Sequence, residues 1–265
     1  MKKIILPLLI MILFIAGCSK LEQGVKDISG FKYSEKIIVG IDDEFPPMGF
    51  RDERGELVGF DIDLAKETAK RMGVEFEFRP IDWNNKREEL LSGHVDIIWN
   101  GLDITDERKE FMIFSKPYMD DRQIVLAKKD SDWDIHSEYD LADKIVGTQA
   151  GSTSDCYLKR NLKDRLKNHR TYSKFKEALN ALMNDEIEVI VCDELIARYE
   201  ARNNPNLKVI EAKIGVITET GIGFRKEDTE LRDQVQKVFD GMIKDGTAKK
   251  ISEKWFQADL IKARR

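Results

Sequence analysis

The strongest constraint on the fold is an alternation of strand-like and helix-like segments that runs through the sequence twice. Short runs rich in β-branched residues alternate with longer segments whose apolar residues recur at helical spacing. The first series comprises residues 36–42, 59–73, 74–81, 84–93 and 95–99, and the second comprises residues 144–151, 154–166, 168–173, 173–185 and 187–194. This order is typical of a mainly parallel sheet with helices on both faces. A chain of 265 residues is long enough for two such units, so we predict an α/β fold of two lobes.

Residues at the edges of the helical segments support this interpretation. Gly73 follows the first helical segment, and a glycine there readily ends a helix. Asn85, with Glu88 three residues later, marks the start of the next helix, and Gly93 marks its end.

Two segments connect the predicted lobes. Residues 122–130 lead from the first lobe into the second, and residues 215–228 return the chain, after which the helical pattern of residues 229–256 closes the first lobe. Two crossings between lobes predict a two-stranded hinge. The predicted domains are residues 36–125 and 218–265 for lobe 1 and residues 126–217 for lobe 2.

The N-terminus carries a targeting pattern. Lys2 and Lys3 precede an apolar run that is short for a transmembrane helix and ends in small residues before Cys18, which fits a secretory signal. The order Ile15-Ala16-Gly17-Cys18 resembles the lipobox of bacterial lipoproteins, which implies cleavage before Cys18 and acylation of its thiol. We therefore predict a signal peptide at 1–17 and a tether at 18–35, with a plain signal peptide or a membrane anchor as the alternatives.

Charge argues against a nucleic-acid partner. Removal of residues 1–17 removes two lysines and no acid, which leaves 42 basic and 49 acidic residues and a formal charge of −7.

The remaining cysteines, Cys156 and Cys192, can form one disulfide or stay as two thiols, and their spacing does not decide between these. The three histidines match no metal-ligand spacing, so no metal site is predicted.

The unusual polar residues follow the predicted strands. In open α/β sheets, ligands bind outside the carboxyl ends of the strands. Four loops occupy such positions, namely residues 42–48, 100–108, 149–155 and 192–194. Their shared position predicts a ligand cleft between the two lobes.

Three features of these loops suit a zwitterion. The guanidinium of Arg108 can hold a carboxylate through two parallel hydrogen bonds, and the turn at 151–154 offers N–H groups at a helix N-terminus. Asp193 follows an apolar strand and can face an ammonium group. Each also has a plain structural alternative, because Arg108 can be a solvated helix charge, and Thr153 and Asp193 can each cap a helix.

Several motifs, in order, resemble the family 3 extracellular solute-binding proteins, the polar amino-acid receptors of ABC importers. They are VGIDDEFPPMGF, GFDIDLAK, GLDITDERKEFMIFSKPY, VGTQAGSTS and KWF, and the resemblance covers about residues 36 to 257. It implies a type II periplasmic-binding-protein fold, with the ligand cleft between two α/β lobes. It also implies a monomer without cofactor or catalytic residues, which binds a small-molecule amino acid and delivers it to the permease of an ABC importer.

The resemblance assigns roles to nine residues. Arg108 would bind the ligand carboxylate with help from Thr153 and from backbone N–H groups near Asp103 and Thr153, while Asp193 would bind the ammonium with help from the Gly101 carbonyl. The remaining assignments are Phe45 and Trp83 as aromatics that sandwich the ligand side chain, and Asp42 and Gln149 as contacts to its distal end.

Asp103 departs from the family pattern, in which many members carry Ser or Thr. It brings a second carboxylate near the ammonium, as in some receptors for cationic amino acids. Because a buried charge needs a partner, Asp103 and the acids at 42–44 favour a cationic or amide side chain. The sequence does not decide between arginine, lysine, histidine, glutamine and a larger amino acid such as cystine.

Two other classes of function compete with transport. Some dehydratases that act on prephenate or arogenate have a similar fold, and a sensory ligand-binding domain is a third class. Asp193 and the TDER motif favour amino-acid capture, and lipidation favours import at the cell surface. Ser19 after the lipidated cysteine favours a host with one membrane, so the predicted location is the outer face of the cell membrane, or the periplasmic side in a host with two.

Overall fold

The computed structural model describes residues 36–262. Its strands are β1 (Lys36–Ile41), β2 (Glu44–Phe45), β3 (Gly49–Arg51), β4 (Leu57–Val58), β5 (Glu75–Pro80), β6 (Ile97–Ile98), β7 (Met112–Phe114), β8 (Met119–Lys128), β9 (Ile145–Gln149), β10 (Asn168–Tyr172), β11 (Val189–Asp193), β12 (Leu207–Thr220) and β13 (Gly223–Arg225). Its α-helices are α1 (Phe60–Met72), α2 (Lys86–Leu91), α3 (Asp106–Lys109), α4 (Thr153–Asn161), α5 (Phe175–Met183), α6 (Glu194–Asn203), α7 (Thr229–Lys244) and α8 (Thr247–Phe256). Two 3₁₀ turns occupy Trp83–Asn85 and Glu138–Leu141. The predicted signal peptide, the tether and Cys18 lie outside the described residues.

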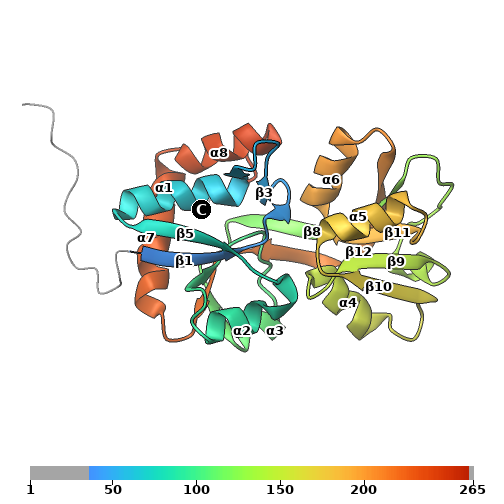
Figure 1. Cartoon of the computed structure of the whole chain (residues 1–265), viewed down its shortest axis with the longest axis horizontal. Coiled ribbons are helices and arrows are strands. Elements are labelled where there is room, and N and C mark those ends of the chain that lie inside the picture. The colour runs from blue at the N-terminus through green and yellow to red at the C-terminus, as the bar shows by residue number, and fades with distance from the viewer. Residues whose placement is uncertain (1–35, 263–265) are drawn as a thin grey trace, which may run out of the picture. The chain divides into compact units, whose positions relative to one another are not determined.

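The first sheet has the strand order β5-β1-β6-β13-β7. β1 pairs in parallel with β5 and β6, whereas β13 pairs antiparallel to both β6 and β7. Helices α1, α7 and α8 pack against one another, and α2 contacts β1, β6 and β13. Figure 1 shows α1 and α8 on one side of β1 and α2 on the other, so both faces of this sheet are covered.

The second sheet has the order β10-β9-β11-β8-β12. β9 pairs in parallel with β10 and β11, and the long strands β8 and β12 continue the sheet antiparallel. Helices α5 and α6 lie on one side of this sheet and α4 on the other (Figure 1). Both sheets therefore keep three neighbouring parallel strands, as predicted. Each sheet also contains one strand that runs against all the others, β13 in the first and β8 in the second, and the alternation did not predict these.

Alternating apolar residues bury one face of β1, the second strand of the first sheet. Ile37, Val39 and Ile41 point to one face of the strand and are at most 2% exposed. In α5, the apolar side chains of Phe175, Ala178 and Leu182 recur at helical spacing and are all buried. Truncation of Phe175 to alanine would cost about 3–5 kcal/mol by the usual cost of an emptied aromatic core position.

The predicted helix boundaries hold at Gly73 and differ near Asn85. Gly73 ends α1 in the left-handed region, with φ 72°. α2 begins directly after Asn85, but the Asn85 side chain donates to Asp82 instead of capping α2. The preceding 3₁₀ turn, capped by Asp82, takes the place of the expected capping box. α2 then ends before Gly93, at Leu91.

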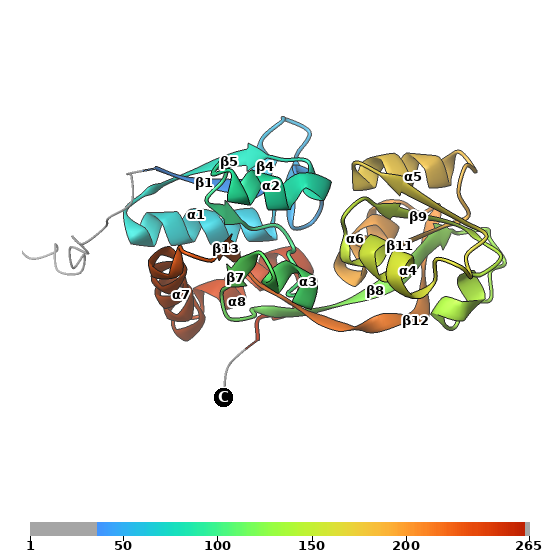
Figure 2. The same ribbon diagram turned by 90° about the horizontal axis from the view of Figure 1, so that it is seen from below.

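Two strands join the sheets. β8 and β12 pair from Met119 and Thr220 at one end to Lys128 and Leu207 at the other, and Figure 2 shows them running from one lobe to the other. An isolated bridge between Asp103 and Thr220 ties the start of this ribbon to the first lobe. The predicted two-lobed fold with a two-stranded connection is confirmed. The predicted lobe boundaries at 125/126 and 217/218 fall inside these strands.

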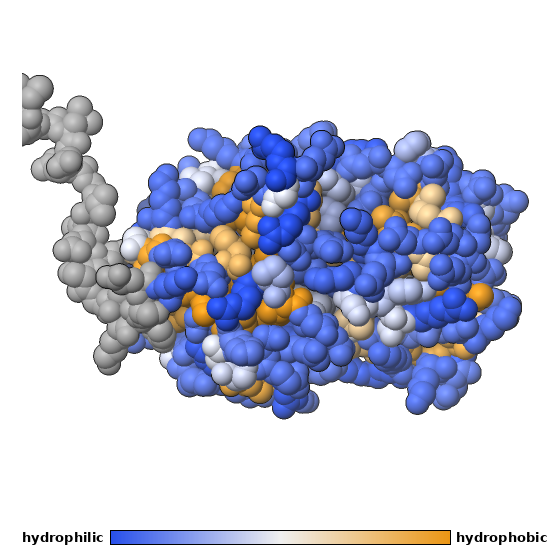
Figure 3. Space-filling model, viewed as in Figure 1, coloured by the Kyte–Doolittle hydropathy of each residue, from blue (hydrophilic) through white to orange (hydrophobic). Residues whose placement is uncertain are grey.

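The exposed surface is mainly polar. Hydrophilic residues cover most of the face in Figure 3, and apolar residues gather mainly on the first lobe. Within residues 36–262, no helix is long and apolar enough to span a membrane.

Candidate functional site

The loops that follow the parallel strands meet around a small cavity between the lobes. The residues lining it are Asp42, Phe45, Trp83, Asn100, Gly101, Arg108, Gln149, Ser152, Thr153 and Asp193. Eight of the nine residues predicted from the sequence are in this set, and Asp103 is the exception. The free space at its centre is about 10 Å³, which is close to the minimum for one water molecule. Direct contacts between the lobes therefore nearly fill the cleft.

Arg108 is buried at one end of this cavity and is not a solvated helix charge. It lies in the single turn of α3, whose cap Thr105 accepts a hydrogen bond from the Arg108 N–H at 3.2 Å. The guanidinium is anchored by the Asp103 carbonyl at 2.9 Å and approaches the Gly151 carbonyl of the second lobe at 3.4 Å. A guanidinium that is 5% exposed and faces a cavity can receive an anion.

The N-terminus of α4 faces the same end. Ser152, and not Thr153, caps this helix, because the Ser152 hydroxyl accepts a hydrogen bond from the Asp155 N–H at 3.1 Å. Thr153 is the first residue of the helix and lines the cavity with Ser152. The positive end of the helix dipole thus lies beside the Arg108 guanidinium, which strengthens the preference for an anion.

Three carboxylates gather near the cavity on its other side. Asp103, Asp121 and Asp193 have carboxylate oxygens within 4.8 Å of one another, and within residues 36–262 this is the only group of acidic, histidine or cysteine side chains close enough to hold a cation together. Gln123 Nε2 donates to Asp193 at 2.8 Å and to Asp121 at 3.2 Å. Asp193 occupies the N-cap position of α6 but makes no capping bond with its side chain. The alternative role of Asp193 as a helix cap is therefore not observed.

Burial and mutual repulsion disfavour the charged forms of these acids. Burial, assisted by the Asp103 carboxylate, raises the pKa of Asp193 to about 7. Burial also raises the pKa of Asp103, and burial together with Asp193 raises that of Asp121 well above its ordinary value. Neither Asp103 carboxylate oxygen has a hydrogen-bond partner among the described residues, and the Asn100 amide also has none. Such groups are normally paired when buried, so this end of the cavity offers unsatisfied acceptors to a cation.

At the distal end of the cavity, which is the end lined by Asp42 and Gln149, the buried carboxylate is by contrast fully hydrogen-bonded. Asp42 is 1% exposed, and its two carboxylate oxygens accept hydrogen bonds from Gln149 Nε2 at 2.6 Å and from Lys174 Nζ at 2.8 Å. The rings of Phe45 and Phe175 meet edge to face, with centroids 6.1 Å apart. Because Asp42 and Phe45 belong to the first lobe and their partners to the second, this end also holds the lobes together.

A buried lysine and a glycine make a further contact between the lobes. Lys86 Nζ donates to the Trp83 and Gly151 carbonyls, each at 2.8 Å. Burial and the neighbouring Arg108 lower the pKa of Lys86 to about 7. Gly151 has φ 68°, and a Cβ there would lie 2.9 Å from the Asn84 Cα of the other lobe. Only glycine combines this backbone conformation with so close an approach.

A carboxylate from α1 fixes the loop that carries Gly101. The Asp61 side chain accepts hydrogen bonds from the Gly101 N–H at 2.6 Å and from the Tyr118 hydroxyl at 2.8 Å. Burial raises the pKa of Asp61 to about 7. Gly101 itself has φ 59°, which suits glycine at this turn.

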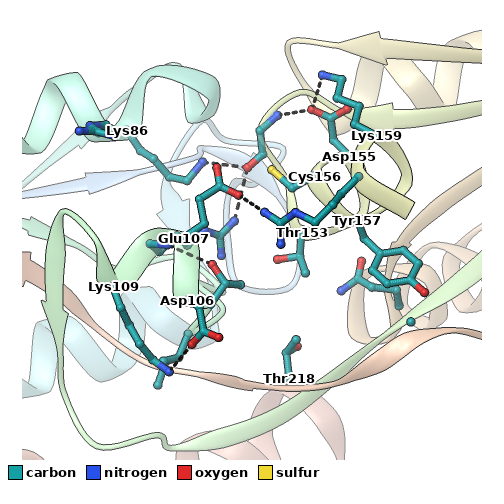
Figure 4. Close-up of a pocket in the computed structure, with 18 of the residues that line it drawn as sticks. Lys86, Asp106, Glu107, Lys109, Thr153, Asp155, Cys156, Tyr157, Lys159 and Thr218 are labelled. Atoms are coloured by element: carbon teal, nitrogen blue, oxygen red, sulfur yellow. Dashed lines mark hydrogen bonds and ion pairs between the residues drawn. The ribbon is translucent and has the colours of Figure 1, made fainter. Parts of the chain in front are cut away.

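A larger groove of about 620 Å³ lies beside the candidate site and shares Arg108 and Thr153 with it. Figure 4 shows its lining, with Glu107 and Lys109 on one side and Tyr157 and Lys159 on the other. Charged residues of its lining pair with one another, namely Lys109 with Asp106, Lys159 with Asp155, and Arg160 with Glu107. Because these charges are already paired, we place the candidate site in the small cavity and not in the groove.

The two cysteines of the second lobe are free thiols. Cys156 lies in α4 and is half-buried, and Cys192 lies in β11 and is buried. Burial raises the pKa of both thiols. Of the two alternatives left open by the sequence, the structure therefore has the pair of thiols.

Sequence reasoning missed several residues of the site. They are Lys86, Asn100, Asp121, Gln123, Ser152 and Lys174. Lys174 follows the carboxyl end of β10, so the rule that located the other loops also covers it. Asp121 and Gln123 are two residues apart on β8 and share one face, but no pattern marks this strand as part of a site. Nothing in the sequence distinguishes Lys86 from a solvated helix lysine.

Comparisons with known proteins identify the family of this chain. Residues 37–258 match the family model described as bacterial extracellular solute-binding proteins, family 3. The L-cystine-binding protein TcyJ of Escherichia coli is 31% identical over 226 residues, which is 85% of this chain and 84% of that protein. The ABC transporter arginine-binding protein 1 of E. coli is 30% identical over 233 residues, or 86% of this chain and 93% of that protein. A substrate-binding protein of a Streptococcus pneumoniae ABC uptake transporter, solved with bound histidine, is 37% identical with a TM-score of 0.80, over 86% of this chain and 95% of that one.

Proposed function

The chain belongs to the bacterial extracellular solute-binding proteins, family 3, and we propose that it is a receptor for a polar L-amino acid with an amide or cationic side chain. The ligand binds in the small cavity between the lobes, and the receptor delivers it to the permease of an ABC importer. The family consists of binding proteins, and the related proteins described above bind cystine, arginine or histidine. The proposed role involves no catalysis.

The observation that carries this proposal is the separation of opposite charges across one cavity. Arg108 and the N-terminus of α4 suit a carboxylate, while Asp193 and the unpartnered Asp103 carboxylate suit an ammonium group. An α-amino acid carries both groups on one carbon atom. We assign Arg108 and Thr153 to the ligand carboxylate, and Asp193, Asp103 and the Gly101 carbonyl to its ammonium group.

The remaining cavity residues are assigned to the ligand side chain. Phe45 and Trp83 are 9% and 6% exposed and offer apolar surfaces. Asp42 and Gln149 offer an acid and an amide at the distal end. A polar side chain that can make hydrogen bonds fits these groups, and an acidic side chain would face the carboxylate of Asp42.

We also propose that acylation of Cys18 anchors the protein to the outer face of the cell membrane. The lipobox-like residues 15–18 support this assignment, and the polar segment 18–35 would tether the domain. Lobe 1 would comprise residues 36–125 and 218–265, and lobe 2 would comprise residues 126–217. This division makes β8 and β12 the hinge.

Titration calorimetry of the purified chain with each L-amino acid tests the proposal. We expect saturable binding of glutamine, arginine or another member of the polar class, and weaker or no binding of aspartate and glutamate. Mass spectrometry of small molecules released from natively purified protein provides an independent identification. Absence of binding to every amino acid, together with turnover of prephenate or arogenate, would instead identify a dehydratase.

A further inference from the structure

Besides Arg108, a second positively charged side chain lies at the cavity: Lys174 contacts Asp42 at the distal end. It lies at the N-cap position of α5, two residues after the end of β10, and reaches from the second lobe to the first. Its Nζ is 2.8 Å from one Asp42 carboxylate oxygen and 3.8 Å from the Asp43 carboxylate. The other Asp42 oxygen accepts from Gln149 at 2.6 Å.

Neighbouring carboxylates keep the Lys174 side chain positively charged. Partial burial lowers the pKa of Lys174, but the carboxylates of Asp42, Asp43 and Glu44 raise it more, so the net shift is upward. The ammonium group is therefore charged at neutral pH and neutralises the buried Asp42 carboxylate. The Lys174 side chain is 23% exposed, whereas that of Asp42 is only 2% exposed.

We propose that Lys174 is the residue that selects the ligand side chain, and that it favours a neutral amide over a cation. The inference rests on the proposed function, because it concerns the distal end of the same cavity. A cationic side chain either displaces the lysine from Asp42, so that one ammonium–carboxylate pair is exchanged for another, or approaches the Asp42 oxygen bonded to Gln149 while Lys174 stays in place. The exchange of one pair for another brings little net attraction. If Lys174 stays in place, its ammonium group repels the positive charge of the ligand side chain.

An amide side chain avoids this competition. Its NH₂ group donates hydrogen bonds and its oxygen accepts them. It can therefore donate to Asp42 while accepting from Lys174 or from the Gln149 amide, and the Asp42–Lys174 pair can stay in place. Glutamine and asparagine are the common amino acids with this chemistry.

The test compares ligand preference in the full-length chain and its Lys174→Ala variant. Calorimetric dissociation constants for L-glutamine, L-asparagine, L-arginine and L-lysine are measured for both proteins. We expect the wild type to prefer an amide ligand, and the variant to bind arginine or lysine about tenfold more tightly, since an opposite charge within about 4–6 Å is typically worth one pKa unit or more. Amide affinity should change by less than about threefold, because only one of its hydrogen bonds is lost.

Two further variants separate charge from structure. Lys174→Gln keeps a hydrogen-bond donor but removes the charge, so it should shift the preference in the same direction even if Lys174→Ala folds poorly. Lys176→Ala removes an exposed lysine on the same helix and should leave the preference unchanged.

Two results would overturn the inference. One is an arginine-to-glutamine affinity ratio that stays within about twofold of wild type in both Lys174 variants while they bind amino acids, because a charge effect of this kind exceeds 0.4 kcal/mol. The other is a wild type that prefers arginine or lysine to both amides. If neither wild type nor variants bind any amino acid, the proposed function fails, and this inference fails with it.

Discussion

The two ends of the candidate cavity differ in how completely their polar groups are paired. At the distal end, both oxygens of Asp42 have partners in the other lobe. At the opposite end, the Asp103 carboxylate and the Asn100 amide have no partner among residues 36–262. Polar groups that already have partners must lose one hydrogen bond for each that they form with a ligand. Groups without partners gain a hydrogen bond for each group that the ligand supplies. In the proposed receptor, this difference would separate recognition of the common part of an amino acid from discrimination between side chains.

The largest expected effect comes from removal of the Arg108 guanidinium, the positive charge that we propose binds the ligand carboxylate. Arg108→Ala should weaken ligand binding by about 3–5 kcal/mol, by analogy with the loss of one partner of a buried pair. Ligand at about a hundred times its dissociation constant adds about 2.7 kcal/mol to wild type, which raises the melting midpoint by roughly 5–10 °C. Calorimetry and thermal melts should show that this shift largely disappears, while the variant without ligand still folds.

Two comparisons make that experiment specific. Arg108→Lys should recover only part of the affinity, because a point charge cannot make the bidentate contact. Arg54→Ala, which removes an exposed arginine paired with Asp52, should behave as wild type. An Arg108→Ala variant that keeps near-wild-type affinity would disprove the assignment.

Protons should compete with the ligand at the acidic end. The pKa of Asp193 is raised from 3.8 to about 7 by burial, so a bound ammonium must displace a proton at lower pH. Ligand affinity should therefore fall by up to about tenfold per pH unit below this pKa. Calorimetry between pH 5 and 8 measures the slope, and Asp193→Asn should lose both the affinity and the pH dependence.

The unliganded protein should show the opposite trend. Between the ordinary pKa of 3.8 and the raised value of about 7, folded Asp193 holds more protons than the unfolded chain does. The free energy of unfolding therefore falls as pH rises through this window, unless another group compensates. Denaturant unfolding of wild type and Asp193→Asn at pH 5 and 7 isolates this contribution, and an identical pH dependence in both would contradict it.

A smaller effect is expected where the backbone of the second lobe touches the backbone of the first. Gly151→Ala places a Cβ 2.9 Å from Asn84 Cα of the other lobe, so the lobes must separate slightly. We expect a loss of about 1–3 kcal/mol in ligand binding, which is the usual cost of overpacking. Gly55→Ala is a matched control, because Gly55 has φ 80° but no neighbour within 4 Å of the added Cβ. If both variants lose affinity equally, backbone strain and not contact between the lobes is the cause.

The smallest effect concerns the second lobe alone. Because Cys156 and Cys192 are free thiols, reductant should leave the melting midpoint unchanged. In a Cys18→Ser background, thiol titration of the unfolded, unreduced chain should count two groups. A count of zero would show that a disulfide forms between them.

The sequence predicted the parts of the site that lie at strand ends. Arg108, Thr153, Gln149 and Asp193 were located together because the carboxyl ends of parallel strands meet at one edge of each sheet. Periodicity also predicted a mainly parallel sheet in each lobe, but not the insertion of β13 between β6 and β7, because pairing between distant segments leaves no local signal.

Residues that bridge the lobes were the hardest to predict. Lys86 and Lys174 are ordinary lysines at the ends of helical segments, and their roles arise only from the way one lobe meets the other. Asp103 was expected in the cavity lining, but its carboxylate joins Asp121 and Asp193 beside it. Asp103 contacts Arg108 through its backbone and not through its carboxylate, because the Asp103 carbonyl accepts a hydrogen bond from the Arg108 guanidinium.

The place of β13 in the first sheet constrains the order in which the two lobes can be completed as the chain emerges from its N-terminus. β1, β5, β6 and β7 come early, but the position between β6 and β7 is filled only when Gly223–Arg225 arrives. Helices α7 and α8, which cover this lobe, follow later still. The second sheet needs only residues up to Thr220. The lobe that begins the chain is thus the last to be completed, and until then β6 and β7 lack the strand that pairs with both of them, which leaves an edge open to wrong pairing.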